Sequence, residues 1–184
     1  AVVAQGRLMG DAPEEVLGTE AEKLSSNLFW AWYDETACMK DWILIANPGA
    51  ERVRAQILIA GQPMVNSLSP GASDYGQTYF LIEAGKSITP DFPDVMNGPV
   101  EVRAYSDTGA WANETDRRDA IASQRVLSNN GTAFNEVPGI PAAELSDSYL
   151  WTWYDELSLG MRDWILEANP GSAAGTEQIK QADA

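Results

Sequence analysis

Two stretches decide how this chain is interpreted, and each occurs twice. Asn27-Leu-Phe-Trp-Ala-Trp-Tyr-Asp34 returns as Ser148-Tyr-Leu-Trp-Thr-Trp-Tyr-Asp155. Met39-Lys-Asp-Trp-Ile-Leu-Ile-Ala-Asn-Pro-Gly49 returns as Met161-Arg-Asp-Trp-Ile-Leu-Glu-Ala-Asn-Pro-Gly171. The offset is 121 residues for the first stretch and 122 for the second, a difference that a surface loop tolerates. A period of this length has the size of a single β-sandwich and is too long for the repeat of a solenoid.

The repetition continues upstream of these stretches. Val3–Leu8 aligns with Ile121–Val126, and Glu15–Gly18 aligns with Glu136–Gly139. We therefore expect the chain to begin on the last strand of one unit, to run through one complete unit and to stop part-way into the next. The expected divisions are 1–26, a last strand plus linker; 27–128, a complete module; 129–147, a Pro-containing linker; and 148–184, a truncated second module.

Bulk composition limits the classes of partner. The net charge is −15, so nucleic acid and anionic membranes would be repelled. Hydrophobic residues make up 45% of the chain and seven of them are Trp, which is enough for a packed core. No stretch has the length of an apolar membrane helix, so membrane insertion is not expected. The acidic surface suits an extracellular or cell-surface protein, with cation binding by clustered carboxylates as the alternative.

Catalytic and redox chemistry have little support. The chain has no His, which removes Ser-His-Asp triads, Cys-His dyads and His-based metal sites. Cys38 is the single cysteine, so no internal disulfide can form. We expect neither an enzyme nor a bound cofactor.

Short alternating runs bounded by Gly, Pro, Asn and Asp predict an all-β fold, an antiparallel immunoglobulin-like β-sandwich. The expected strands are approximately 28–33, 41–47, 52–60, 77–83, 86–89, 98–106 and 119–128. In the second of these, Trp42, Leu44 and Ala46 keep their apolar character in both copies, whereas Ile45 becomes Glu167. This comparison predicts that the Trp42 side faces the core.

The other strands give further predictions about their two faces. Val53 and every second residue after it should point inward, and so should Val100 and its alternate neighbours. The first strand is apolar on both faces, with Leu28, Trp30 and Trp32 on one side and Phe29, Ala31 and Tyr33 on the other. A strand with two apolar faces should be covered on both, by its own core and by a linker, an adjacent module or a partner.

The second copy loses its pattern after Gly171, and two strands alone cannot bury their apolar faces. We expect the tail of one subunit to pack with the head of the next, giving a homopolymer. The alternative is that residues 2–9 fold back on their own sandwich. The residues expected at interfaces or in packing are Trp30, Trp32, Tyr33, Tyr149, Trp151, Trp153, Tyr154, Trp164, Val3 and Leu8.

Three further features could carry function. Asp34, Glu35 and Asp41 recur as Asp155, Glu156 and Asp163, and we interpret them first as turn-ordering carboxylates, with calcium as the alternative and catalysis last. Trp30, Trp32 and Tyr33 could instead form a sugar-stacking platform, which makes a glycan the alternative partner. Asn113 and Asn130 begin N-glycosylation sequons in predicted loops.

The Trp-Tyr-Asp, Asp-Trp-Ile-Leu-x-Ala-Asn-Pro-Gly and Ser-Gln-Arg-Val-Leu-Ser motifs resemble tandem β-sandwich repeats of secreted or surface-anchored bacterial proteins. The resemblance implies an exterior location and a scaffolding or adhesive role, and it transfers no catalytic residue. The expected function is an extracellular structural subunit that assembles head-to-tail into a filament or surface layer. A carbohydrate or cell-wall binding module and a fragment of a long tandem-repeat adhesin are the alternatives.

Overall fold

The computed structural model of the chain describes residues 5–8, 14–17, 19–36, 39–128, 133–150 and 165–180. The described part is all-β, as predicted, and its strands pair antiparallel. The strands are β1 (Gln5–Leu8), β2 (Glu14–Leu17), β3 (Asn27–Trp30), β4 (Tyr33–Asp34), β5 (Lys40–Ala46), β6 (Val53–Ile59), β7 (Gln62–Pro63), β8 (Phe80–Ile82), β9 (Ser87–Ile88), β10 (Met96–Asn97), β11 (Val100–Ser106), β12 (Ile121–Ser128), β13 (Ala133–Pro138) and β14 (Ile140–Pro141).

Helical structure in the described residues is confined to short 3-10 turns. These are η1 (Ala21–Lys23), η2 (Glu114–Asp116) and η4 (Ala142–Glu144). None of the helices in this part of the chain has the length and apolarity that crossing a membrane requires.

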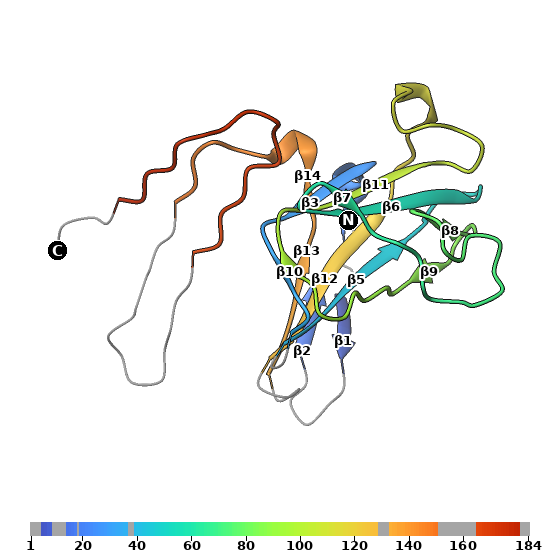
Figure 1. Cartoon of the computed structure of the whole chain (residues 1–184), viewed down its shortest axis with the longest axis horizontal. Helices are drawn as coiled ribbons and strands as arrows, with labels where there is room; N and C mark the ends of the chain where they lie inside the picture. Colours follow the sequence, from blue (N-terminus) through green and yellow to red (C-terminus); the bar gives the residue numbers. More distant parts are fainter. Residues whose placement is uncertain are drawn as a thin grey trace.

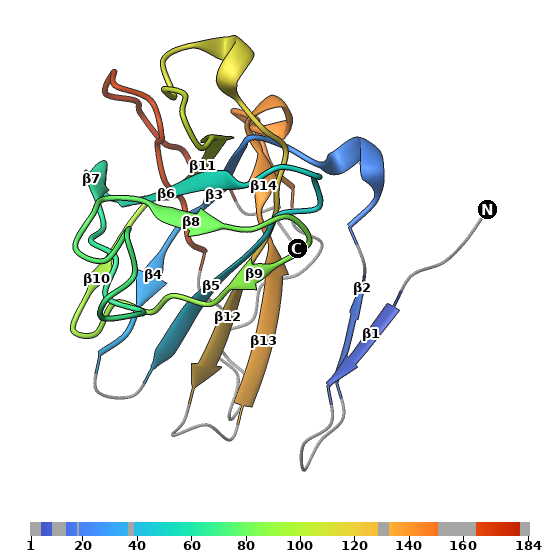
Figure 2. The ribbon, with the colours of Figure 1, turned by 90° about the vertical axis from the view of Figure 1, so that its right-hand side faces the viewer.

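Two main sheets form the layers of a sandwich (Figures 1 and 2). One sheet has the order β14-β3-β11-β6-β7, with β8 also paired to β6, and the other has the order β13-β12-β5-β9. Between them lies a single apolar core, because every second side chain of each strand points inward. Its buried members are Leu28, Trp30, Tyr33, Ile43, Ile45, Val53, Ala55, Ile57, Ile59, Phe80, Ile82, Phe92, Val100, Val102, Ala104, Ala120 and Ala122.

The predicted inward face of β5 is wrong. Ile43 and Ile45 are fully buried in the core, whereas Trp42, Leu44 and Ala46 lie half-buried on the outer face. The prediction assumed that residues 161–168 keep the environment of β5, so that the change from Ile45 to Glu167 would mark a solvent face. Residues 165–168 form no strand, so Glu167 says nothing about that face.

The inward faces of β6 and β11 are as predicted, and the first strand is covered on both faces. Leu28 and Trp30 belong to the core, and the outward Phe29 is also buried, with 8% of its surface exposed. The strand ends earlier than expected, at Trp30, and pairing resumes in β4 with β10. This break reverses the predicted sides, because Tyr33 enters the core while Trp32 is 37% exposed.

The segment predicted as an intermodule linker supplies two strands of the sandwich. β13 pairs along β12, and β14 then crosses to the other sheet and pairs with β3. Two contacts hold this crossing in place. The indole Nε1–H of Trp30 donates to the carbonyl of Val137 at 3.0 Å, and Gly139 packs against the Trp30 ring, where a Cβ would lie only 2.7 Å from a ring carbon. The segment is thus part of the fold.

Candidate interaction surfaces

The N-terminal hairpin β1–β2 reproduces the hairpin β12–β13 pair for pair. Arg7 lies opposite Glu15, as Arg125 lies opposite Glu136. The other three pairs of β1–β2 also fall on pairs of β12–β13 under the sequence alignment. Because a slip of one residue would exchange the two faces of a strand, the identical register means that equivalent residues lie on equivalent faces of the two hairpins.

The equivalence continues past the hairpins. η1 at Ala21–Lys23 and η4 at Ala142–Glu144 occupy the same place in the repeat, at the 121-residue offset. Each follows the second strand of its hairpin and precedes the aromatic stretch. The borders between units therefore share one local structure, from the hairpin through the 3-10 turn.

Beyond η4 the two copies differ, although their sequences match. Residues 148–150 and 165–168 form no strand, whereas their counterparts belong to β3 and β5. Leu150 is 96% exposed, and its counterpart Phe29 is 8% exposed. A strand requires partners for its backbone groups, and the partners of β3 are β11 and β14. The second copy has the motif without these neighbours.

One local element is present in both copies, the Asn-Pro-Gly turn. In the complete module the Asn47 Oδ1 accepts the Gly49 N–H at 2.9 Å, and the Asn47 Nδ2 donates to the Glu51 carbonyl at 2.7 Å. In the second copy the Asn169 Oδ1 accepts the Gly171 N–H at 2.9 Å, and the Asn169 Nδ2 donates to the Ala173 carbonyl at 2.6 Å. This turn needs only its own side chain, so it forms without the sheet.

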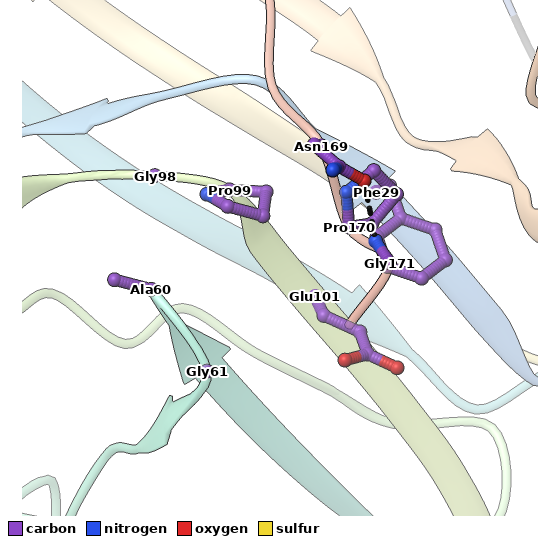
Figure 3. Close-up of a pocket in the computed structure, with 9 residues that line it drawn as sticks. All are labelled: Phe29, Ala60, Gly61, Gly98, Pro99, Glu101, Asn169, Pro170 and Gly171. Carbon is purple, nitrogen blue, oxygen red and sulfur yellow. Dashed lines mark hydrogen bonds between the residues drawn. The ribbon is translucent and has the colours of Figure 1, made fainter. Parts of the chain in front are cut away.

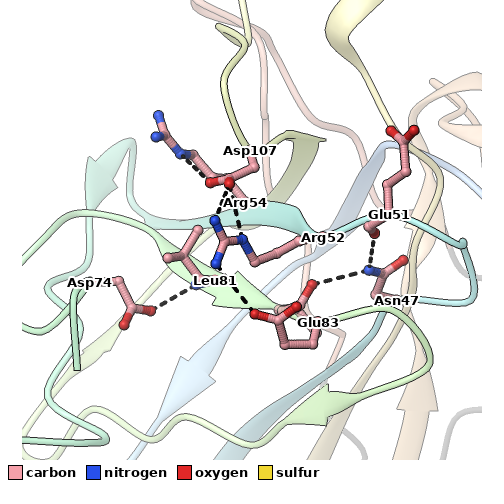
Figure 4. A network of polar contacts seen from close by, with 9 residues as sticks. Asn47, Glu51, Arg52, Arg54, Asp74, Leu81, Glu83 and Asp107 are labelled. Carbon is pink, nitrogen blue, oxygen red and sulfur yellow. Dashed lines mark hydrogen bonds and ion pairs between the residues drawn. The ribbon is translucent and has the colours of Figure 1, made fainter.

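The two turns differ in how they are held. The Asn47 side chain is buried and its Nδ2 also donates to the Ile82 carbonyl at 3.1 Å, which ties the turn to β8. The neighbouring start of β6 carries a polar network in which Arg52 bonds Asp107 and Glu83 (Figure 4). Asn169 is exposed and lies outside the sandwich.

The turn at Asn169–Gly171 lines a hollow on the outer side of the six-stranded sheet (Figure 3). The module side of this hollow is formed where β3, β6 and β11 meet, by Phe29, Ala60, Gly61, Gly98, Pro99 and Glu101. The turn therefore covers part of the outward face of β3, a face that the sequence predicted to be covered.

The recurrent acids in and around the connection from β4 to β5 form a cluster of hydrogen-bonded carboxylates. Asp34 Oδ1 accepts the N–H of Thr36 at 3.0 Å, and Asp41 Oδ2 accepts the N–H of Asp34 at 2.8 Å. Glu35 Oε2 accepts the N–H of Phe92 at 2.9 Å. These bonds are those of turn-ordering carboxylates, which was the first interpretation of the motif. Among the described residues no three Asp, Glu, Cys or His side chains converge as metal ligands would.

Asp41 is the most strongly perturbed acid of this cluster. It is 2% exposed, and Gln124 Nε2 donates to its Oδ2 at 2.7 Å across to β12. Its Oδ1 is buried and forms no hydrogen bond within the described part of the chain. Burial raises the pKa of Asp41 to about 6, because desolvation disfavours the charged form. Burial likewise raises the pKa of Glu35.

The predicted aromatic residues do not form one exposed platform in the complete module. Trp30 and Tyr33 are buried, and of the three only Trp32 is partly exposed. Tyr149 is 48% exposed and its hydroxyl accepts the N–H of Ser146 at 3.1 Å. Trp151, Trp153, Tyr154, Trp164 and Val3 lie outside the described residues, and of Leu8 the structure describes the backbone pairing with Glu14.

The sequon at Asn113 lies on an exposed loop, as predicted. Its Oδ1 caps η2 by accepting the backbone N–H of Thr115 at 3.4 Å and also accepts the Thr115 hydroxyl at 3.0 Å, while its Nδ2 donates to Asp116 at 3.1 Å. A glycan on Nδ2 would replace a hydrogen of that donor. Asn130 lies outside the described residues.

Sequence reasoning missed the module residues that line the hollow, and it missed the strands at 133–141. The signal for β13 was available in the alignment of Glu15–Gly18 with Glu136–Gly139, which implies a hairpin once β1 is recognised. No family model, curated protein or solved structure matches the chain.

Proposed function

We propose that this chain is a structural subunit that assembles head-to-tail with copies of itself, into a filament or layer outside the cell. The observation that carries the proposal is the identical register of β1–β2 and β12–β13. It makes the N-terminal hairpin the closing hairpin of a unit whose opening segment is the sequence from 148 to 171.

The pairing that the proposal predicts follows from the complete module. There β12 pairs with β13 on one side and with β5 on the other, with Ser123 opposite Leu44. β1 corresponds to β12 but pairs only with β2 among the described strands. By equivalence Gln5 of one copy lies opposite Leu166 of the next, and β1 supplies the neighbour that residues 162–168 require.

The arrangement in space favours pairing between copies over pairing within one chain. In Figure 1 residues 165–180 extend to the left of the sandwich while the hairpin β1–β2 overlaps it, and in Figure 2 the hairpin stands apart on the right while residues 165–180 lie on the left. A contact between two different surfaces of one protein is heterologous and propagates.

Two observations favour a location outside the cell. The net charge of −15 suits a solvent-facing repeat, and the exposed sequon at Asn113 is open to modification. A sugar-binding role gains no support from the buried Trp30 and Tyr33.

Sedimentation of the full chain over a range of concentrations tests the proposal, with Leu166→Pro as the variant. Leu166 is exposed and lies in no strand, so proline there should leave thermal unfolding of the module unchanged. It should abolish concentration-dependent growth in mass, because Leu166 corresponds to Leu44, whose N–H faces β12, and proline removes the equivalent donor toward β1. Gln178→Pro, in the exposed polar tail, is the control and should assemble normally. A wild-type chain that stays monomeric at high concentration would overturn the proposal.

A further inference from the structure

The hollow beside β3 is lined so that a backbone turn can pack closely into it. Glu101 of β11 lies between Phe29 of β3 and Leu58 of β6 in register, which places one aromatic and one acidic side chain on the outer face. Ala60 and Pro99 also line the hollow, and Gly61 and Gly98 beside them have no side chains to fill it. A main-chain segment can therefore approach closely, and here that segment is Asn169–Gly171 (Figure 3).

A second turn of the same construction exists in the chain. Asn47–Gly49 has the same two side-chain hydrogen bonds as Asn169–Gly171, and Pro48, Gly49 and Ala50 are exposed. In the order of the repeat, Asn169–Gly171 is the turn of the following unit seated on the complete module. By the same order, Asn47–Gly49 should be seated on the corresponding hollow of another module.

We propose that the hollow formed by Phe29, Ala60, Gly61, Gly98, Pro99 and Glu101 is the docking site for an Asn-Pro-Gly turn of a second copy of this chain. The incoming turn is Asn47–Gly49, and it replaces Asn169–Gly171 in the hollow. The inference rests on the proposed self-association, and adds the second contact that fixes how successive modules are oriented. The in-chain turn competes with it, because a tethered segment has a high effective concentration.

A cross-link between positions 48 and 101 reports only on contact between copies. Pro48 precedes the start of β6, whereas Glu101 lies opposite Leu58 near the other end of that strand. Five residues of extended strand separate Val53 from Leu58, which is about 16 Å. Pro48→Cys and Glu101→Cys are therefore placed on separate chains, both in a Cys38→Ser background, and mixed with a short bis-maleimide.

The expected result is a cross-linked dimer of the two different chains. Asn169→Ala with Pro170→Gly in the Glu101→Cys chain should raise its yield several-fold, because these changes remove the competing turn. Ser69→Cys, on another exposed loop, replaces Pro48→Cys as the control and should give only background. The inference would be overturned if the Glu101→Cys chain that carries Asn169→Ala and Pro170→Gly gave no more product than this control.

Head-to-tail assembly and turn docking can be refuted independently of each other. Turn docking should persist when Leu166→Pro is added, because it does not use strand pairing. Assembly that is normal in sedimentation but gives no cross-link between positions 48 and 101 would refute turn docking alone. A cross-link in chains that never exceed the mass of a dimer would refute the filament alone.

Discussion

At the scale of single residues, the buried carboxylate of Asp41 joins β5 to its neighbour β12 and to β4. It accepts from the Asp34 backbone and from Gln124 of β12, while its second oxygen stays buried without a hydrogen bond inside the described chain. The charged form is therefore stabilised less in the fold than in water, and the pKa of Asp41 rises from 3.8 to about 6.

This shift predicts the direction of the pH dependence of stability. The folded state binds the Asp41 proton more tightly than the unfolded state does, so the free energy of unfolding should rise as pH falls from about 7 to about 4. The contribution of this group is about 3 kcal/mol, since each pKa unit corresponds to about 1.4 kcal/mol. Chemical denaturation of wild type and Asp41→Asn across this range measures it.

Asp41→Asn should lose that part of the pH dependence, whereas the contribution of the other acids remains in both proteins. Equal slopes in the two proteins would refute the assignment to Asp41. Burial also raises the pKa of Glu35, so some slope in the same direction should survive the substitution.

A second residue, Gly139, is required by packing. A Cβ there would lie 2.7 Å from the Trp30 ring, at the point where the chain crosses between sheets. Gly139→Ala should destabilise the fold by about 1–3 kcal/mol, because the ring cannot move without leaving the core. Gly175→Ala, whose Cβ would meet nothing closer than 3.6 Å, should be near neutral in the same thermal unfolding experiment. Similar losses from both substitutions would contradict this account.

At the scale of elements, the same sequence has different consequences in its two copies. The Asn-Pro-Gly turn forms in both, because its bonds are local, whereas β3 and β5 form only where β11, β12 and β14 are present to pair with them. Local chemistry therefore determines the turns, and tertiary pairing determines the strands.

This difference predicts unequal effects of one substitution at equivalent positions. Asn47→Ala removes bonds to Gly49, Glu51 and Ile82 in a buried site and should cost about 2–3 kcal/mol. Asn169→Ala removes the equivalent local bonds in an exposed segment and should leave the unfolding midpoint of the module unchanged. Equal losses would mean that the second turn is as deeply integrated as the first.

The same contrast explains what could be predicted from the sequence. The all-β class, most strands and the inward faces of β6 and β11 follow from alternation, because each lies in a sheet with one buried face. The face of β5 could not be obtained by comparing copies, because Ile45 and Glu167 do not share an environment. The docking hollow could not be predicted, because it joins β3, the end of β6 and β11 only after folding.

At the scale of the whole molecule, the sandwich lies between two segments that match parts of it. The hairpin β1–β2, which has the register of β12–β13, precedes the sandwich, and residues 148–171, whose sequence matches that of 27–49, follow it. Apolar side chains of that segment remain exposed, with Leu166 at 55% and Tyr149 at 48%. A neighbouring copy can bury them by supplying its hairpin.

The most direct measurement is a disulfide between Gln5→Cys in one chain and Leu166→Cys in another, both with Cys38→Ser. The register of β12 with β5 places these positions opposite each other if β1 pairs with the next copy. We predict a dimer of the two different chains in high yield, with little product when Ala168→Pro accompanies Leu166→Cys, because the N–H of Ala46, the counterpart of Ala168, faces β12. Mixed disulfides no more abundant than those of either single-cysteine chain with itself would contradict the account.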